Sequence, residues 1–515
     1  MSYLSVIGDW RMTIFGNDIQ GVGDPASHYL ANGINFFDYA HVPYSLHPGL
    51  NLTFLIQIIA KIYYWLSTNF GMPVSYGAFV GKNLVTLFFL SRVMVSAVYL
   101  VSFYLLFLFS SIFLKSRAHA LIAVFAYATT LNVIFYHNVV NVESIMLSFV
   151  ILTFLCFWQY INRVKGGKAI NGLKYIILSS LFAVLAFYSK FLLCWPLLIL
   201  IPFYILVYKR TQTGTIPFKS RLLGSGVFLL FSGALLYIVG KKIDFSRFLQ
   251  VHFYLHNSFA ARHYGLSGII YNKQHSWLFN AGSNLAQFLR EYIGIIFWRL
   301  PTFMYNTKNL TWAHSNAAFK ITEYPFLIMF LFGVFLYWKK NPQMRLYLIH
   351  LLLFIILITP ALLYRAGFHY FFFHLAFGAV FFSYFIRCLY EKIVPGCAND
   401  RRQFFILAIG TLLIHSASVA GGLGAKINDL RQYKKWRPYH MALKDIGYNE
   451  RIGIIRDREK YKEDSQFLNS LSGGFYSLIS RKSEVSKNFT EHFVFSDEDF
   501  SQEALRKDSI KVVMK

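Results

Sequence analysis

The sequence predicts an all-α polytopic membrane protein of about ten to eleven transmembrane helices, with a small soluble domain of α/β type at its C-terminus. Hydrophobic residues form 56% of the 515-residue chain and charged residues only 14%, whereas soluble domains carry about 25% charge. The apolar residues gather in runs long enough to cross a bilayer. The basic residues gather in short clusters between those runs, as is typical of membrane proteins.

The predicted transmembrane segments approach the roughly 20 apolar residues that are needed to cross the hydrocarbon core. They lie at 84–114, 118–137, 142–161, 173–189, 191–208, 222–240, 324–338, 346–364, 367–386 and 403–420. An earlier run at 46–67 could also span, but Asn51, Gln57 and Lys61 interrupt it. Because the lysine and the Tyr-Tyr-Trp at 63–65 suit the headgroup zone, we expect an interfacial helix on the outer surface here.

The net charge of +26 would suit a nucleic-acid partner, but the placement of the charges favours a membrane topology, and we expect no nucleic-acid partner. The basic clusters fall on alternate connections, near residues 115–117, 163–174, 209–221, 339–345 and 387–402. The positive-inside rule assigns these connections to the cytoplasm. The remaining connections and both ends of the chain are then external.

This topology divides the chain into five regions. They are an external first loop with interfacial helices at 1–83, transmembrane helices at 84–240, a large external loop at 241–323, transmembrane helices at 324–420 and an external soluble domain at 421–515. From residue 425 onward the chain mixes 18 Lys and Arg with 14 Asp and Glu, and its apolar runs are short. That composition predicts a soluble domain rather than further spans.

Two acidic residues on the external side are candidate catalytic groups. Asp24 lies just above the bilayer and could act as a general base, although Asp followed by Pro is also a common start of a helix. Glu143 opens an apolar helix at its external end, where an acid can also serve only to complement the helix dipole. Both interpretations stay open for each residue.

Two cations on the external side are candidate ligands of a lipid phosphate. Lys190 lies between two apolar helices, where a positive charge needs an anionic partner, although its side chain could also simply extend to the interface. Arg365, in the segment 365–370, suits bidentate phosphate recognition, and an interface anchor is the alternative.

Metal and thiol chemistry have weaker signals. The loop 252–275 holds four histidines, of which His252 and His256 share i, i+4 spacing, together with Arg262. A metal site there would lack the carboxylate that usually completes one, so the metal requirement is left open. The four cysteines show no CxxC or metal-binding spacing, which predicts neither a disulfide framework nor a reactive thiol.

In their order along the chain, these segments resemble the protein O-mannosyltransferase and lipid A aminoarabinose transferase superfamily, the GT-C class of glycosyltransferases. The segment 24–29, Asp-Pro-Ala-Ser-His-Tyr, is similar to the family's Asp-Glu-x-x-x-Tyr motif, with Pro25 in place of the glutamate. The His-Pro-Gly stretch that begins at His47 resembles the family's His/Lys-Pro-Pro stretch. Arg92 resembles the Arg that lies near the start of the following helix.

The resemblance continues in the later segments. Glu143 occupies the position of the acid that opens the family's fourth helix. Lys190 resembles the lysine of a Thr-Lys pair beside the lipid phosphate, and the segment from Arg365 to Tyr370 resembles a late Arg/Lys…Tyr motif.

The resemblance implies a polyprenyl-phosphate sugar donor and a single inverting displacement at the anomeric carbon on the non-cytoplasmic side. Asp24 would deprotonate the acceptor hydroxyl, with Glu143 as a second catalytic residue, while Lys190, Arg365 and Tyr370 would bind the donor phosphate. We add as candidate substrate-loop residues His47, Arg92, His256 and Arg262.

The expected setting is the inner membrane of a bacterium, with the active site in the periplasm. The acceptor is a lipid, glycan or protein hydroxyl, no cofactor is required, and a divalent metal is left open. A transporter or flippase of lipid-linked sugars is the alternative, against which the sequence shows no internal repeat and no charge comparable to a proton relay within the spans. Because no apolar segment precedes Asp24 where the family has a helix, we expect a start site upstream of Met1 or a naturally truncated chain.

Overall fold

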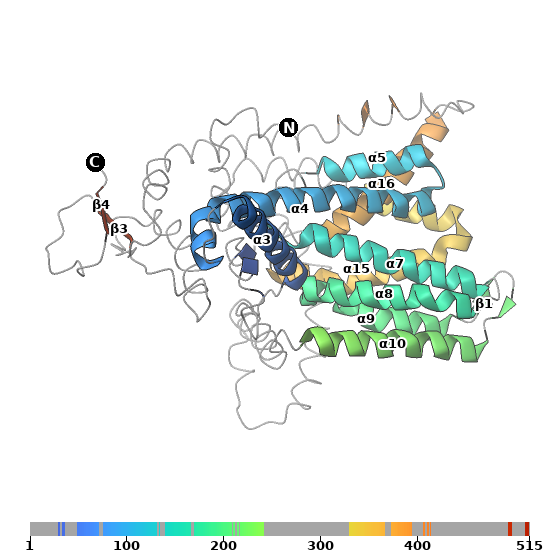
Figure 1. The fold of residues 1–515 in the computed structure, drawn as a ribbon. Coiled ribbons are helices and arrows are strands. Elements are labelled where there is room, and N and C mark those ends of the chain that lie inside the picture. The colour runs from blue at the N-terminus through green and yellow to red at the C-terminus, as the bar shows by residue number, and fades with distance from the viewer. Residues whose placement is uncertain are drawn as a thin grey trace, which may run out of the picture. The chain divides into compact units, whose positions relative to one another are not determined.

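The structure is a computed structural model whose described part is almost entirely helical (Figure 1). The described residues are 49–71, 76–130, 140–165, 169–208, 217–240, 329–365 and 372–393, with a few residues each near 29–36, 133, 210–215, 405–413, 493–496 and 510–513. They belong to two compact units, each described by itself. Unit 1 takes residues 1–99, 135–144 and 424–515, and unit 2 takes residues 100–134 and 145–423.

Within the described residues, six helices are long and apolar enough to cross a membrane, or up to seven if a bent helix pair forms one span. The six helices are α3 (Leu50–Phe70), α4 (Tyr76–Leu114), α7 (Glu143–Lys165), α8 (Ala169–Ser189), α10 (Phe218–Gly240) and α16 (Phe372–Ile393). They support the prediction of an all-helical, multi-pass membrane protein.

Two apolar helices are shorter than a full span. They are α5 (Arg117–Ala128) and α9 (Phe191–Val207), the latter with Pro196 and Pro202 inside it. The predicted span at 118–137 therefore begins as expected, but its described helix ends at Ala128.

One predicted span begins earlier in the structure, and the predicted interfacial segment forms a long apolar helix. α4 begins at Tyr76, well before the predicted start at residue 84, and has a non-helical residue at Asn83. α3 is long and apolar enough to span, so the interfacial placement of the run at 46–67 stays a prediction. The predicted external loop at 241–323 and most of the predicted span at 403–420 lie outside the described residues.

The bent pair joins the helix Met329–Lys340 to the segment Pro342–Ile358 at an angle of 109°. The short 3₁₀ helix η2 (Pro342–Met344) connects it to α15 (Arg345–Arg365). Pro342 lacks the backbone N–H that a continuous helix would use, which favours a break here. The predicted spans at 324–338 and 346–364 therefore meet at a sharp bend rather than across a loop.

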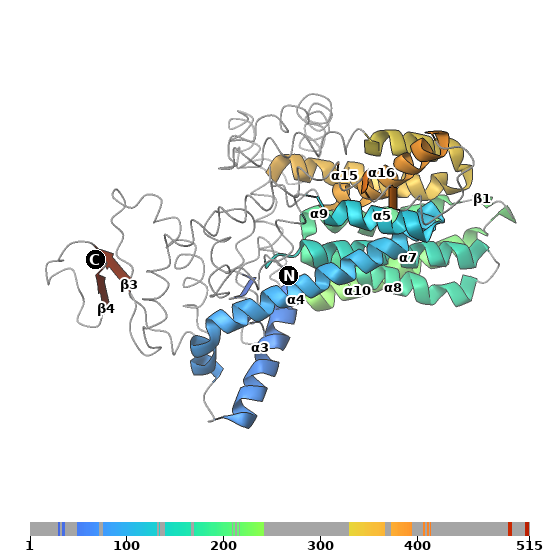
Figure 2. The ribbon, with the colours of Figure 1, turned by 90° about the horizontal axis from the view of Figure 1, so that it is seen from above.

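The consecutive helices α7 to α10 lie side by side, each antiparallel to the next (Figures 1 and 2). The Ser179 hydroxyl on α8 donates to the Thr153 carbonyl on α7 at 3.0 Å. The Tyr188 hydroxyl on α8 donates to the Leu236 carbonyl on α10 at 2.5 Å. These contacts fix the register of the three helices.

The core of unit 2 is built from aromatic rings. The ring centroids of Phe109 and Trp158 are 5.1 Å apart, and Phe113 lies 5.3 Å from Trp158 and 5.6 Å from Tyr337. Tyr337 also donates a hydrogen bond to the Phe113 carbonyl at 3.1 Å. Rings in such tilted and edge contacts contribute about 0.5–1.5 kcal/mol per pair beyond the area they bury.

The predicted soluble domain is described only by two strands. β3 (Phe493–Ser496) and β4 (Ile510–Val513) pair in parallel. A parallel pair needs a crossover connection, which is compatible with an α/β domain but does not establish one. A second small sheet, the hairpin of β1 (Arg210–Thr211) and β2 (Gly214–Thr215), connects α9 to α10.

Candidate functional site

The predicted site residues fall into two groups. The structure describes the side chains of Glu143 and Arg92 in unit 1 and of Lys190 in unit 2, and it places Arg365 at the last position of α15. The remaining predicted site residues, which lie outside the described residues, are Asp24, His47, Tyr370, His256 and Arg262.

Three of the sequence motifs meet at Gly49 in unit 1. Tyr29, the last residue of the 24–29 motif, is fully buried, and Gly49 ends the His-Pro-Gly motif. A Cβ atom on Gly49 would overlap the ring of Tyr29 and would lie 2.9 Å from Cγ1 of Val142. Because Val142 directly precedes Glu143, Gly49 links the first two motifs to a candidate catalytic residue.

Glycine is required at position 49 for two physical reasons. Its φ of 45° and ψ of 33° place it in the left-handed region, which costs other residues about 1–2 kcal/mol. The neighbouring ring and methyl group leave no room for a side chain. Directly after Gly49, α3 begins, and the Gly49 carbonyl accepts a hydrogen bond from the Thr53 amide at 2.9 Å.

A buried hydrogen-bond network holds the chain just after Tyr29. The Phe36 amide donates to Oε1 of Gln57 at 3.0 Å, and Nε2 of Gln57 donates to the Tyr76 hydroxyl at 3.2 Å. That hydroxyl donates in turn to the Ile34 carbonyl at 3.1 Å. The network therefore joins the segment 34–36 to α3 and to the start of α4.

Gly33 and Lys61 add to this network. A Cβ atom on Gly33 would lie 2.5 Å from Cγ2 of Ile56, so the segment lies directly against α3. The Lys61 ammonium lies 3.7 Å from the centroid of the Tyr76 ring, within the range of a cation–π interaction. The residues that interrupt the apolar run at 46–67 are thus used in part for internal contacts.

Glu143 is a fully buried acid and the first residue of α7. No other Asp or Glu occurs between Asp38 and Asp244 in the sequence. Burying a carboxylate at membrane depth is costly and marks a functional-site candidate. Its position also places it where the helix dipole favours a negative charge. Asn141 and Ser144 beside it are buried as well, so the surroundings are polar.

Arg92 is buried on α4, within unit 1. A guanidinium is always charged, and burial at membrane depth requires partners for it. The sequence pattern alone did not indicate that Arg92 is buried. Its burial is compatible with the prediction that Arg92 is functional.

Lys190 is a buried cation in unit 2, with 1% of the residue exposed. It lies between α8 and α9, and its carbonyl accepts hydrogen bonds from the amides of Leu193 and Cys194 at 3.2 Å each. Because α8 runs antiparallel to α7, Lys190 lies at the end of unit 2 opposite to Arg163 near the end of α7. A simple extension of this lysine to the interface does not fit its burial.

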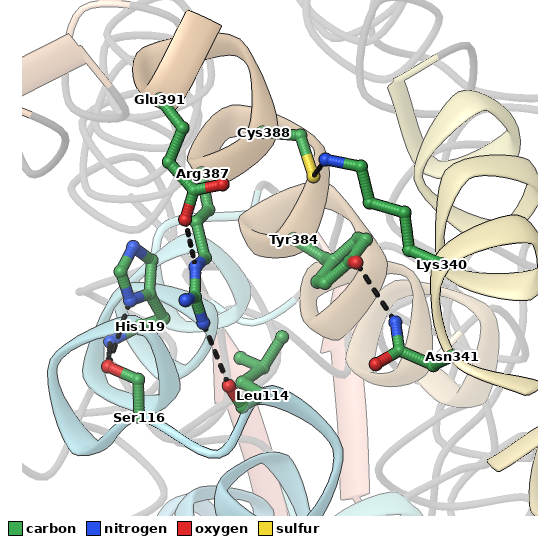
Figure 3. A network of polar contacts seen from close by, with 9 residues as sticks. All are labelled: Leu114, Ser116, His119, Lys340, Asn341, Tyr384, Arg387, Cys388 and Glu391. Carbon is green, nitrogen blue, oxygen red and sulfur yellow. Dashed lines mark hydrogen bonds and ion pairs between the residues drawn. The ribbon is translucent and has the colours of Figure 1, made fainter. Parts of the chain in front are cut away.

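The basic clusters of unit 2 gather at the other end of the helices. Arg387 on α16 donates to the carbonyl of Leu114, the last residue of α4, at 3.1 Å (Figure 3). The Tyr347 hydroxyl on α15 donates to Oδ1 of Asn162 near the end of α7 at 2.9 Å. Separate connections with basic residues therefore lie at one end, as the alternation of the clusters predicts.

Sequence reasoning missed Gln57, Tyr76 and the role of Gly49. A glutamine within an apolar run is a usable signal, because a buried amide needs partners of its own. Among the described residues, no group of three or more His, Cys, Asp or Glu side chains could hold a metal ion. The histidines at 252–275 lie outside those residues.

Comparisons with protein-family models, with curated protein sequences and with solved structures gave no match.

Proposed function

We propose that the chain is an integral membrane glycosyltransferase that transfers a sugar from a polyprenyl phosphate to an acceptor hydroxyl, with inversion at the anomeric carbon. The observation that carries the proposal is Glu143, a fully buried acid at the start of α7. It follows Val142, which lies against Gly49, the glycine that also lies against Tyr29. A packing role alone would not favour a carboxylate there, because its burial is costly.

The proposed reaction is a single displacement. The acceptor oxygen attacks the anomeric carbon while Asp24 takes up the hydroxyl proton, which makes the oxygen a better nucleophile. The new carbon–oxygen bond forms as the bond to the phosphate oxygen breaks, and the lipid phosphate leaves with the bonding electron pair. Glu143 acts as the second catalytic carboxylate.

Cations assist the departure of the lipid phosphate in this proposal. Lys190, Arg365 and Tyr370 bind the donor phosphate, because negative charge grows on it in the transition state. The buried ammonium of Lys190 supports this role, since a desolvated cation interacts more strongly with a phosphate than an exposed one. His47, Arg92, His256 and Arg262 contact the substrates. The proposed site faces the periplasm of a bacterial cell, and the C-terminal soluble domain lies on the same side.

A flippase of lipid-linked sugars is a second candidate, and one observation favours it. The helix Met329–Lys340 meets the following segment at 109°, and broken helices of this kind occur in transporters. The buried acid Glu143 and the buried cation Lys190 favour the transferase.

The two candidates are separated by an assay in proteoliposomes. The purified chain is supplied with polyprenyl-phosphate-linked sugars and a mixture of lipid, glycan and peptide acceptors. Formation of a glycosylated acceptor together with free polyprenyl phosphate supports the transferase. Movement of intact donor across the bilayer without loss of its sugar supports the flippase and contradicts the transferase.

A further inference from the structure

The bend between the helix Met329–Lys340 and η2 carries a concentration of positive charge. Lys339 and Lys340 are exposed at the end of the first helix, and Arg345 begins α15. The bend lies at the end of unit 2 where the basic clusters gather.

Hydrogen bonds fix the geometry of this bend (Figure 3). Nδ2 of Asn341 donates to the Tyr384 hydroxyl on α16 at 2.9 Å. The Lys340 ammonium donates to Sγ of Cys388 at 3.5 Å. Nε of Arg345 donates to the Trp338 carbonyl at 3.0 Å, and its guanidinium lies 5.3 Å from the centroid of the Trp338 ring. The cations are therefore held on a fixed framework.

The charge at the bend is not neutralised within the described part of unit 2. Glu391 is the one acidic residue there, and its carboxylate pairs with Nε of Arg387 at 2.7 Å. The lysines at the bend therefore form a surface of net positive charge beside the Arg387–Glu391 pair. An anionic group would complement this surface.

An apolar stripe leads to the same cations. Leu331, Phe335 and Trp338 are 58%, 61% and 39% exposed, and their i, i+4, i+7 spacing places them on one side of the helix. Trp is enriched at the membrane–water interface, so we expect Trp338 to lie there and Leu331 and Phe335 to face the hydrocarbon core. The apolar part of this surface therefore adjoins its cationic part along the helix.

We propose that this surface, formed by Leu331, Phe335, Trp338, Lys339, Lys340 and Arg345, binds one bilayer phospholipid with an anionic headgroup. The lysines and Arg345 bind the phosphate and the headgroup charge, and the stripe contacts an acyl chain. Basic surfaces between transmembrane helices suit anionic lipid headgroups for this reason. The inference is independent of the proposed sugar transfer.

The test is native mass spectrometry of the purified full chain with phosphatidylglycerol or phosphatidylcholine. The variant Lys339→Gln/Lys340→Gln is compared with Lys174→Gln/Lys219→Gln, which removes the same charge from exposed lysines on α8 and α10 at the same end. We expect wild type and the control to retain one phosphatidylglycerol and to bind it at least about tenfold more tightly than the bend variant, since each basic residue contributes about 1 kcal/mol.

Three outcomes would overturn the proposal. The first is that both double variants bind phosphatidylglycerol equally weakly. The second is that the wild type retains phosphatidylcholine as well as phosphatidylglycerol. The third is that, in thermal unfolding of the wild type, glycerol phosphate stabilises the protein as much as phosphatidylglycerol does. Should the double variant fail to fold, as judged by size-exclusion chromatography, the single variant Lys340→Met keeps the apolar stem and serves the same comparison.

Discussion

α3 in unit 1 and α10 in unit 2 are both apolar helices, but they bury different side chains. α3 buries Thr53 and Gln57 while it exposes Phe54, Ile58 and Trp65. α3 also buries Leu52 and Ile56, so its faces do not separate polar from apolar residues as those of a helix at the surface of a soluble protein do. α10 also exposes large apolar residues, and it buries the small residues Gly224, Ser225 and Ser232 together with Phe228.

Buried positions serve helix packing on α10 and hydrogen bonding on α3. On α10, small buried residues allow neighbouring helices to approach closely, and Gly224 lies directly against Tyr160. On α3, Gln57 forms hydrogen bonds that hold the segment after Tyr29. On α3 a buried polar side chain thus positions a segment beside the candidate motifs, whereas on α10 the small buried residues serve helix packing.

The largest expected effect concerns the two described acids. Glu143→Gln keeps the size of the side chain but removes its charge, and it should lower turnover by about 10²–10⁴-fold. Glu391→Gln is the control, because it removes an acid from an exposed pair that contributes only about 0–1 kcal/mol. Initial rates of sugar transfer are measured for both variants. Equal rates would contradict a catalytic role of Glu143.

Glycines in the two units should respond differently to the same substitution. Gly49→Ala should destabilise the fold by about 2–5 kcal/mol, the sum of left-handed strain and overpacking. Gly226→Ala on α10 should leave stability unchanged or raise it slightly, since no atom lies within 4 Å of its added Cβ. Thermal unfolding in detergent measures both, and a stable Gly49→Ala variant would contradict the described contact with Tyr29 and Val142.

Lys190 is a buried charged residue in unit 2, so candidate chemistry is not confined to unit 1. Lys190→Ala should weaken donor binding by about 10- to 100-fold, the value of a lost charge-assisted hydrogen bond. Lys219→Ala removes an exposed lysine at the basic end and serves as control. Titration with a polyprenyl phosphate measures the two dissociation constants, and unchanged binding in Lys190→Ala would exclude a phosphate-binding role.

The smallest effect is expected from one hydroxyl group. Tyr76→Phe leaves the buried Ile34 carbonyl without its donor and should lower stability by about 1–3 kcal/mol. Tyr104→Phe on α4 removes the hydroxyl of an exposed tyrosine and should have no measurable effect. Denaturant unfolding compares the two, and equal midpoints would mean that the network does not hold the segment 34–36.

Hydropathy predicted most of the helices because their apolar runs are long and their neighbouring clusters are charged. The bounds of α7, α8 and α10 agree with the predicted spans to within a few residues. The bend at Asn341 was not predicted, because basic residues near a proline look the same in a loop as in a broken helix. The charge pattern nevertheless predicted which connections lie together.

The candidate site could be predicted only in part. Glu143 and Lys190 were identified because ionisable residues beside apolar runs are rare, and both are buried. Gln57 was taken for an interruption of a helix, since its partners at Phe36 and Tyr76 are distant in the sequence. The left-handed conformation of Gly49 likewise depends on a tertiary contact that no local pattern encodes.

Release of polyprenyl phosphate from a lipid-linked sugar by the purified chain tests the proposed transfer most directly. Wild type and Asp24→Asn are compared in proteoliposomes that contain donor and acceptor, with the free lipid phosphate quantified by mass spectrometry. The proposed transfer predicts release by the wild type together with glycosylated acceptor, and release at least about 10²-fold slower in Asp24→Asn. Equal release in both proteins, or sugar that crosses the bilayer still bound to its lipid, would contradict it.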